Sequence, residues 1–190
     1  MGSRFFALVI GINQYPGLKR NNQDHDLGGA CNDARNICEW LVQYVLPGTD
    51  NGHITLWDLF QGKSNDNITL LLNTQATRKE IIKKITALSN NKNIQPGDPI
   101  LIYYAGHGSV AMTHPNWHHA ANGGGDVESA DRSLIEVLLP HDVYMPIEAP
   151  PDQQVQPIPD TTMNRLMREL AQKSDNIVRP SSLLQSPLYA

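Results

Sequence analysis

The chain has 190 residues, of which 40% are hydrophobic, and a formal net charge of −4. This length suits one domain with a sizeable core. The negative charge argues against a nucleic-acid partner, because phosphate binding needs clustered Lys and Arg. The two cysteines, Cys31 and Cys38, fall in one predicted helix with their Cα atoms about 10 Å apart, beyond disulfide reach. We therefore expect reduced thiols and a cytoplasmic location.

The first apolar run, from Phe5 to Ile12, follows Arg4 as the core of a signal peptide would. It is too short to span a membrane, and the polar residues after it offer no cleavage site. We therefore predict a buried strand here and no membrane partner.

Apolar runs and helical stripes alternate along the first 105 residues. A continuous apolar run is typical of a strand buried on both faces, and apolar residues three and four positions apart are typical of a helix. The predicted order is strand, helix, strand, helix, strand, over Phe5–Ile10, Ala30–Val45, Ile68–Leu72, Ile81–Leu88 and Ile100–Ala105. This order predicts an α/β sandwich with a mostly parallel central sheet.

The second predicted helix begins with a capping-box pattern. Thr77 is the expected N-cap, and Glu80 is expected to reach back to the backbone N–H of Thr77. The helix before it is expected to stop at Pro47-Gly48.

The second half of the chain is less regular. We expect a long polar loop from Ser109 to Arg132 and a short strand from Leu134 to Leu139. The stretch from Pro140 to Pro159 holds six prolines and is expected to be irregular. A helix from Asp160 to Gln172 and the start of a strand at Asn176–Val178 complete the prediction.

His107 directly follows the third strand, between Gly106 and Gly108. Ligands of open α/β sheets collect at the carboxyl edge of the strands. A histidine placed there can take a proton from a nucleophile and pass it to a leaving amine. By position alone, a histidine in a glycine-rich turn that merely ends a strand is an equally good interpretation.

Five segments in order resemble the caspase/metacaspase-type cysteine peptidases. They include the first strand, the first helix start with its Asn-Asp-Ala, and the catalytic-histidine motif Tyr-Ala-Gly-His-Gly. The segments are Phe6–Asn13, Leu27–Ala34, Ala76–Ile81, Tyr103–Ser109 and Glu136–Asp142. Together they span most of the chain, and the resemblance is closest to metacaspases and their fungal-type relatives.

The resemblance implies a caspase-like three-layer α/β sandwich and a Cys/His dyad that cleaves peptide bonds. His107 maps onto the dyad histidine, and Gly108 maps onto the glycine whose N–H stabilises the oxyanion. The implied partners are peptide or protein substrates cut after Arg or Lys. Asp142 is expected to help line an acidic pocket for that side chain, although a solvated loop acid is the other interpretation. No cofactor is expected, and the resemblance leaves calcium activation open.

The nucleophile of the dyad is missing from the expected place. No cysteine follows Cys38, whereas the family places one at the end of a strand that would continue Asn176–Val178. We therefore expect an incomplete caspase-like domain over residues 4–178, with its C-terminal part missing, and a non-homologous, disordered tail over residues 179–190. Cys31 and Cys38 are expected to be buried core thiols, and the chain as written is predicted to be inactive.

Two other functions compete with an active peptidase. The first is a catalytically dead caspase-like module that binds partners, including a full-length homologue. The second is a metal-dependent hydrolase that uses His114, His118 and His119, since histidines four residues apart on a helix share a face. Pro115 and the nearby glycines argue against a helix there. A flexible polar loop is the competing interpretation of these histidines.

Overall fold

The structure is a computed structural model that describes residues 4–18, 25–48, 55–61, 67–112, 134–144, 150 and 153–178. Within these ranges, no helix combines the length and the apolar character needed to cross a bilayer. The predicted tail over residues 179–190 lies outside them, and so does most of the polar loop predicted after the His107 strand.

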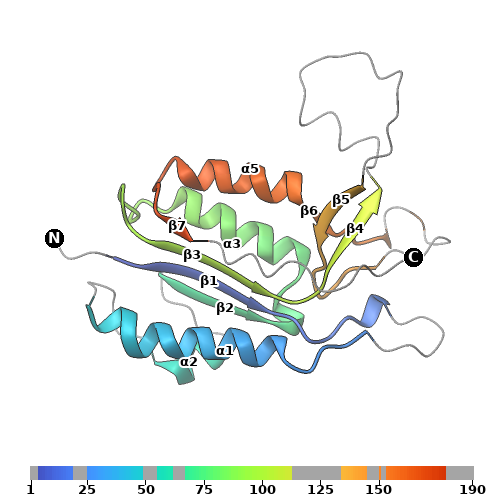
Figure 1. Ribbon diagram of the computed structural model, residues 1–190, viewed down its shortest axis with the longest axis horizontal. Coiled ribbons are helices and arrows are strands. Elements are labelled where there is room, and N and C mark those ends of the chain that lie inside the picture. The colour runs from blue at the N-terminus through green and yellow to red at the C-terminus, as the bar shows by residue number, and fades with distance from the viewer. Residues whose placement is uncertain are drawn as a thin grey trace, which may run out of the picture.

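A four-stranded parallel sheet with the order β2-β1-β3-β7 forms the centre (Figure 1). The strands are β1 (Phe6–Gly11), β2 (Ile68–Leu72), β3 (Ile100–Ala105) and β7 (Ile177–Val178). β1 pairs with β3 over its whole length, whereas β7 pairs with β3 over two residues. The predicted α/β class with a parallel sheet is confirmed, and the carboxyl ends of β1, β2 and β3 lie at one edge.

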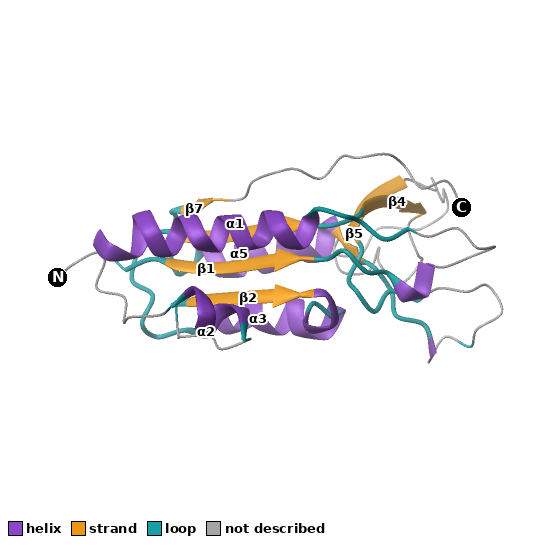
Figure 2. Cartoon of the chain, turned by 90° about the horizontal axis from the view of Figure 1, so that it is seen from below, coloured by secondary structure: helices purple, strands orange, loops and turns teal. Residues whose placement is uncertain are grey.

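Helices cover both faces of this sheet (Figures 1 and 2). α3 (Arg78–Asn90) and α5 (Asp160–Ala171) lie on one face. α1 (Ala30–Trp40) and the short α2 (Leu56–Phe60), which the sequence did not predict, lie on the other. This is the three-layer arrangement that the resemblance implied.

The first strand is apolar at every position because it faces two cores. Phe6, Leu8 and Ile10 belong to the cluster under α3 and α5, while Ala7 and Val9 belong to the cluster under α1. Successive side chains of a strand point to opposite faces, so a doubly covered strand has a continuous apolar run.

The helix predicted from Ala30 to Val45 is one continuous helical segment whose hydrogen-bond spacing changes. After α1, a π turn covers Leu41–Val45, and a 3₁₀ turn covers Leu46–Gly48. The segment ends at Pro47-Gly48, where the sequence predicted its stop.

Gly11 lets α1 approach the end of β1. A Cβ atom at this position would lie 2.7 Å from Ala34 Cβ and 2.8 Å from the Ala30 carbonyl oxygen. Both distances are far below van der Waals contact, so only glycine fits here.

A smaller antiparallel sheet lies beyond the carboxyl edge of the large one (Figure 1). Its strands, in the order β4-β5-β6, are β4 (Gly108–Met112), β5 (Leu134–Leu138) and β6 (Ile158–Pro159). The prediction that a loop begins at Ser109 is therefore wrong for the first four residues, since these residues pair with β5.

The proline-rich stretch from Pro140 to Pro159 is also more regular than predicted. Ile158 and Pro159 pair with β5, and Tyr144 forms an isolated bridge with Val155. Proline is tolerated at an edge strand because its missing N–H then deprives no neighbouring strand of a hydrogen bond.

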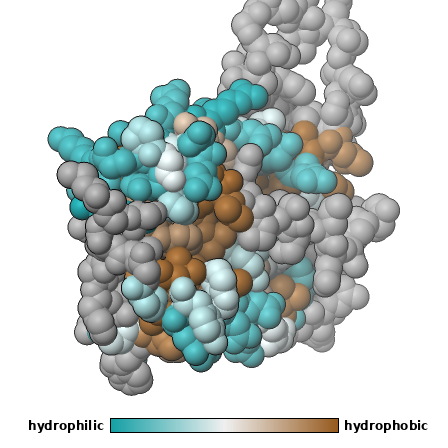
Figure 3. Space-filling model, turned by 60° about the vertical axis from the view of Figure 1, so that its left-hand side comes forward, coloured by the Kyte–Doolittle hydropathy of each residue, from teal (hydrophilic) through white to brown (hydrophobic). Residues whose placement is uncertain are grey.

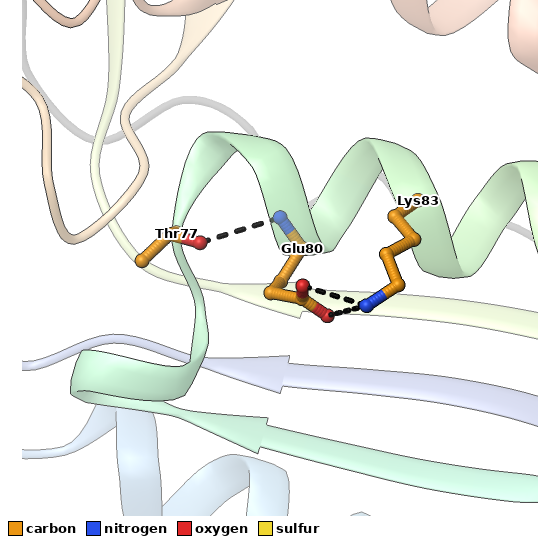
Figure 4. Close-up of polar contacts among 3 residues, drawn as sticks. All are labelled: Thr77, Glu80 and Lys83. Atoms are coloured by element: carbon orange, nitrogen blue, oxygen red, sulfur yellow. Dashed lines mark hydrogen bonds and ion pairs between the residues drawn. The ribbon is translucent and has the colours of Figure 1, made fainter.

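The capping box at α3 is half formed (Figure 4). The Thr77 hydroxyl accepts a hydrogen bond from Glu80 N at 3.3 Å, as predicted. The Glu80 carboxylate turns to Lys83 and contacts its Nζ at 2.9 and 3.2 Å, which corrects the prediction that it reaches back. This contact with Lys83 holds the pKa of Glu80 below its usual value.

Solvent-facing helix surfaces are mostly hydrophilic, and apolar residues show between the layers when the molecule is viewed from the amino ends of the strands (Figure 3). On α5, for example, the exposed face carries the ion pair of Arg165 with Glu169 at 2.6 Å. Leu166, Met167 and Leu170 of the same helix are buried against the sheet.

Candidate functional site

His107 lies two residues after β3, and its backbone is held on both sides. Its N–H donates to the Tyr15 hydroxyl at 2.7 Å. Its carbonyl accepts from Leu139 N at 3.0 Å and from the Tyr104 hydroxyl at 2.8 Å. The position after the strand is therefore an ordered turn rather than a loose connection.

The imidazole ring of His107 has a fixed orientation. Its Nε2 lies 2.7 Å from the backbone carbonyl of His25, and the ring packs against Tyr15 with centroids 4.8 Å apart. A carbonyl oxygen only accepts, so Nε2 must carry the proton in this contact. In the neutral ring, Nδ1 is then the unprotonated nitrogen.

Two buried tyrosine hydroxyls connect the backbone around His107. The Tyr104 hydroxyl also lies 2.9 Å from the Leu139 carbonyl oxygen, so its single proton is shared between two carbonyls. The Tyr15 hydroxyl accepts from His107 N–H and is also hydrogen-bonded to the Tyr104 hydroxyl. Burial raises the pKa of Tyr15 and holds that of Tyr104 well above its usual value, so both hydroxyls keep their protons.

Gly106 leaves room for these hydroxyls. A Cβ atom at Gly106 would lie 2.6 Å from Tyr104 OH and 2.6 Å from Tyr15 OH. The glycine before the histidine therefore accommodates the tyrosine pair.

The loop after β5 closes the site from the side of the small sheet. His141 donates from Nδ1 to the Gln14 carbonyl at 2.8 Å, and its backbone N–H donates to Ala76 O. Asp142 Oδ1 accepts from Arg78 N at 2.8 Å, so this carboxylate caps the first turn of α3. Asp142 thus ties the loop to the helix, and its predicted role in a substrate pocket stays a prediction.

Both cysteines are buried, as predicted. Cys38 lies in the apolar cluster under α1, and burial raises the pKa of its thiol to about 12. Cys31 lies at the carboxyl edge, where its Sγ is 3.3 Å from the carbonyl oxygen of Gly11 and 3.3 Å from Asn73 Oδ1. Cys31 Sγ is enclosed between these two oxygens and Cys38 lies among apolar side chains, so neither sulfur is presented to a substrate.

Metal binding has no support among the described residues, where no three His, Cys, Asp or Glu side chains gather as a metal site would need. The three histidines considered for a metal hydrolase, His114, His118 and His119, lie outside those residues. The metal-hydrolase alternative therefore rests on the sequence pattern alone.

Sequence reasoning identified His107 but missed the groups that orient it. Tyr15 follows a strand without any motif of its own, and the His25 contact is made by a backbone carbonyl, which every residue type carries. His141 and Asn73 lie in segments that the family resemblance covers or adjoins, but their polar contacts depend on which loops meet at the edge.

A parallel sheet with helices on both faces and an oriented histidine at its carboxyl edge define an α/β domain with a candidate site at that edge. The model of the caspase domain family matches residues 4–170, so the chain belongs to the caspase domain family. This membership makes it a cysteine-peptidase-like protein by descent.

Several solved structures share the fold, and one of them illustrates it. The crystal structure of protein GSU0716 from Geobacter sulfurreducens superposes with a TM-score of 0.55 at 16% sequence identity, over 93% of this chain and 48% of that one. The chain therefore spans about half the length of this structural relative. No curated protein shows significant sequence similarity to the chain described here.

Proposed function

We propose that this chain is the histidine-bearing part of a cysteine-type endopeptidase domain, with His107 as its general acid–base. The observation that carries this proposal is the 2.7 Å contact between His107 Nε2 and the His25 carbonyl. This contact favours one tautomer of the ring and leaves Nδ1 as the proton acceptor. A histidine that merely ends a strand needs no such orientation of its ring.

In this mechanism, Nδ1 takes the proton of a cysteine thiol as the sulfur attacks the peptide carbonyl. The same proton then passes to the nitrogen of the leaving amine, and water later releases the acyl group from the sulfur. We assign the oxyanion contact to the N–H of Gly108, the first residue of β4 and the direct neighbour of His107.

The nucleophile of this reaction is neither Cys31 nor Cys38. Cys31 is 2% exposed and Cys38 is fully buried, and no other cysteine occurs in the sequence. We therefore propose that the 190-residue chain alone does not turn over substrate. The same burial favours the second candidate, a caspase-like module that binds partners without cleaving them.

The proposed substrates are peptides with Arg or Lys before the scissile bond. Asp142 uses one carboxylate oxygen on Arg78 N, and its other oxygen is the proposed contact for a basic side chain. Asp33 in the first turn of α1 offers a matched comparison, since it is also a carboxylate at this edge and its charge contributes to the raised pKa of Tyr103.

The first experiment measures peptide cleavage by the purified chain. Fluorogenic peptides ending in Arg or Lys are assayed with and without calcium, alongside the His107→Ala variant. We expect equal, background rates for both proteins. Thiol-dependent cleavage that iodoacetamide abolishes would contradict our assignment of the two cysteines.

The second experiment tests binding at the site. Arginine-terminated and glutamate-terminated peptides are titrated into ¹⁵N-labelled protein, and shifts are followed at His107 and Gly108. We expect the arginine peptide alone to move both signals, and Asp142→Asn to weaken this binding more than Asp33→Asn. A stronger effect of Asp33→Asn would indicate that Asp142 does not line the substrate pocket. If neither peptide shifts the signals, a substrate site at His107 is contradicted.

A further inference from the structure

We infer that Asn73 is a positioning residue for His107, because its side-chain oxygen fixes the loop that supplies two of the contacts to this histidine, the Tyr15 hydroxyl and the His25 carbonyl. This inference rests on the proposed role of His107. Asn73 itself lies next to β2, two strands away from β3 in the sheet, and acts through the loop after β1.

The backbone of Asn73 is unusual. It begins the 3₁₀ turn Asn73–Gln75 with φ 41°, and it is the one non-glycine residue with positive φ in the part of the chain that the structure describes. Asparagine adopts this left-handed conformation more readily than most residues. Such a conformation persists where surrounding contacts enforce it, so the contacts of this side chain are informative.

Those contacts converge on one oxygen. Asn73 Oδ1 accepts from Asn13 N at 2.8 Å and from Gln14 N at 3.3 Å, and Cys31 Sγ lies 3.3 Å away. Gly11 and Leu72 are the last paired residues of β1 and β2. The β1–β2 hydrogen-bond ladder ends at these two residues. Beyond it, the Asn73 side chain accepts from backbone N–H groups that follow β1, those of Asn13 and Gln14.

Asn13 then closes the base of the loop. Its carbonyl accepts from Leu27 N at 2.7 Å, and its side-chain Oδ1 accepts from Cys31 N at 3.0 Å. Residues 13 and 27 are thereby locked together next to α1. The described residues next to these two ends, 14–18 and 25–26, are thereby positioned relative to Asn13, and Asn13 is positioned by Asn73.

Two of the residues that hold His107 lie inside this closed loop. Tyr15 OH accepts from His107 N–H, and the His25 carbonyl accepts from Nε2. Tyr15 N also donates to Asp26 Oδ1 at 2.8 Å, which ties the two arms of the loop together. Removing the Asn73 oxygen leaves the Asn13 and Gln14 N–H groups without this acceptor, and the His25 carbonyl loses its fixed place beside Nε2.

The test reads the tautomer of His107 directly. Long-range ¹H–¹⁵N spectra of the full chain, labelled on histidine, distinguish the Nε2–H form from the Nδ1–H form at about pH 8.5, where imidazole rings are largely neutral. His107→Gln assigns the signal. The variants are Asn73→Ala, Asn73→Gly and Asn73→Asp, and Thr74→Ala is the control at the exposed neighbouring position.

We expect the Nε2–H form to dominate in the wild type, in Asn73→Asp and in Thr74→Ala. Asn73→Ala and Asn73→Gly should both show a mixture of tautomers. Glycine tolerates the positive φ that alanine does not, so equal effects would assign the role to the side-chain oxygen rather than to the backbone conformation.

His141 is an internal check, because its Nδ1 donates to the carbonyl of Gln14, whose N–H Asn73 holds. Its Nδ1–H preference should weaken in the same two variants. Unchanged tautomers in folded Asn73→Ala and Asn73→Gly would overturn the inference. If neither variant folds, Asn73→Ser takes their place. Its shorter side chain should give a mixture of His107 tautomers, and a spectrum like that of the wild type would overturn the inference.

The proposed function fails in a different way. Suppose that the wild-type chain binds no peptide but its His107 tautomer still depends on Asn73. This result would support the positioning role of Asn73 and contradict the proposed substrate site. A wild-type ring without a tautomer preference would remove the basis of both.

Discussion

The layer between β1 and α1 is buried and the carboxyl edge of the sheet is partly buried, and the two are held by different forces. Around Cys38 the layer is aliphatic, and its packing has no direction. Around His107 the edge is held by hydrogen bonds: His107 N–H donates to Tyr15, and the His107 carbonyl accepts from Tyr104 and Leu139. Close packing determines that the layers assemble, while directional contacts determine which way one ring faces.

The two cysteines illustrate this difference within one helix. They are seven residues apart, which is close to two turns, so they lie on nearly the same side of α1. Cys38 meets apolar side chains alone, whereas Cys31 lies beside the oxygens of Gly11 and Asn73. The same residue type therefore fills space in one region and belongs to a polar network in the other.

The largest expected effect on stability comes from Gly11→Ala, which disturbs the packing between α1 and β1. The new methyl group would press on the Ala30 backbone oxygen and on Ala34 Cβ, forcing α1 away from β1. We expect a loss of about 2–3 kcal/mol in the free energy of unfolding, measured by urea titration. Gly28→Ala is the control, because nothing lies within 4 Å of a Cβ atom there. Equal stabilities would show that the layer adapts to an extra methyl group.

Tyr15→Phe removes a hydrogen bond of the polar edge. It should lower the free energy of unfolding by about 1–3 kcal/mol, because the partly buried N–H of His107 loses its acceptor. Unlike Gly11→Ala, it should also broaden the His107 ring signals in NMR spectra, since the turn that holds the ring loosens. Tyr103→Phe, on the same strand as Tyr104 but partly exposed, should do neither. A rigid His107 ring in Tyr15→Phe would show that the ring contact and the His25 carbonyl are sufficient.

Alkaline pH should weaken the aliphatic layer through Cys38. Burial raises the pKa of its thiol from 9.0 to about 12, so the folded chain keeps a proton that the unfolded chain releases. The stabilisation is complete below pH 9 and decreases as pH rises toward 12. This group alone should lower the free energy of unfolding by about 1.4 kcal/mol at pH 10. Cys38→Ala should show a flatter decline between pH 8 and pH 10, and identical slopes would contradict the assignment.

The smallest effects are expected on the exposed side of the first turn of α3. Thr77→Ala should cost about 1 kcal/mol, because the Glu80 N–H loses its cap. Glu80→Gln should cost less than Thr77→Ala, since the partner it loses is a solvent-exposed Lys83. Thermal unfolding of the two variants in parallel checks this order, and the reverse order would mean that the ion pair matters more than the cap.

The sequence predicts the large sheet well because its signals are local. Apolar runs mark β1, β2 and β3, and the helical stripe of α3 begins at a recognisable cap. The missed strand β4 has a weak pattern, Gly-Ser-Val-Ala-Met, and its partner β5 lies more than twenty residues further along the chain. Long-range pairing of this kind leaves little trace in either segment alone.

The site is predictable only in part for the same reason. His107 carries a motif and a position, so sequence reasoning finds it. Asp142 belongs to a recognisable segment, but its bond to Arg78 N depends on how the loop after β5 meets α3. The contact at His25 has no residue-type signal at all, because the main chain makes it.

That main-chain contact has a genetic consequence. No substitution at position 25 removes a carbonyl oxygen, so mutational scans should find this position permissive even though its backbone touches the His107 ring. The same scans should show intolerance to the deletion or insertion of a single residue between Asn13 and Leu27, since a change in length shifts the carbonyl itself. In this family member, selection on the loop is therefore expected to preserve its length rather than the identity of its residue 25.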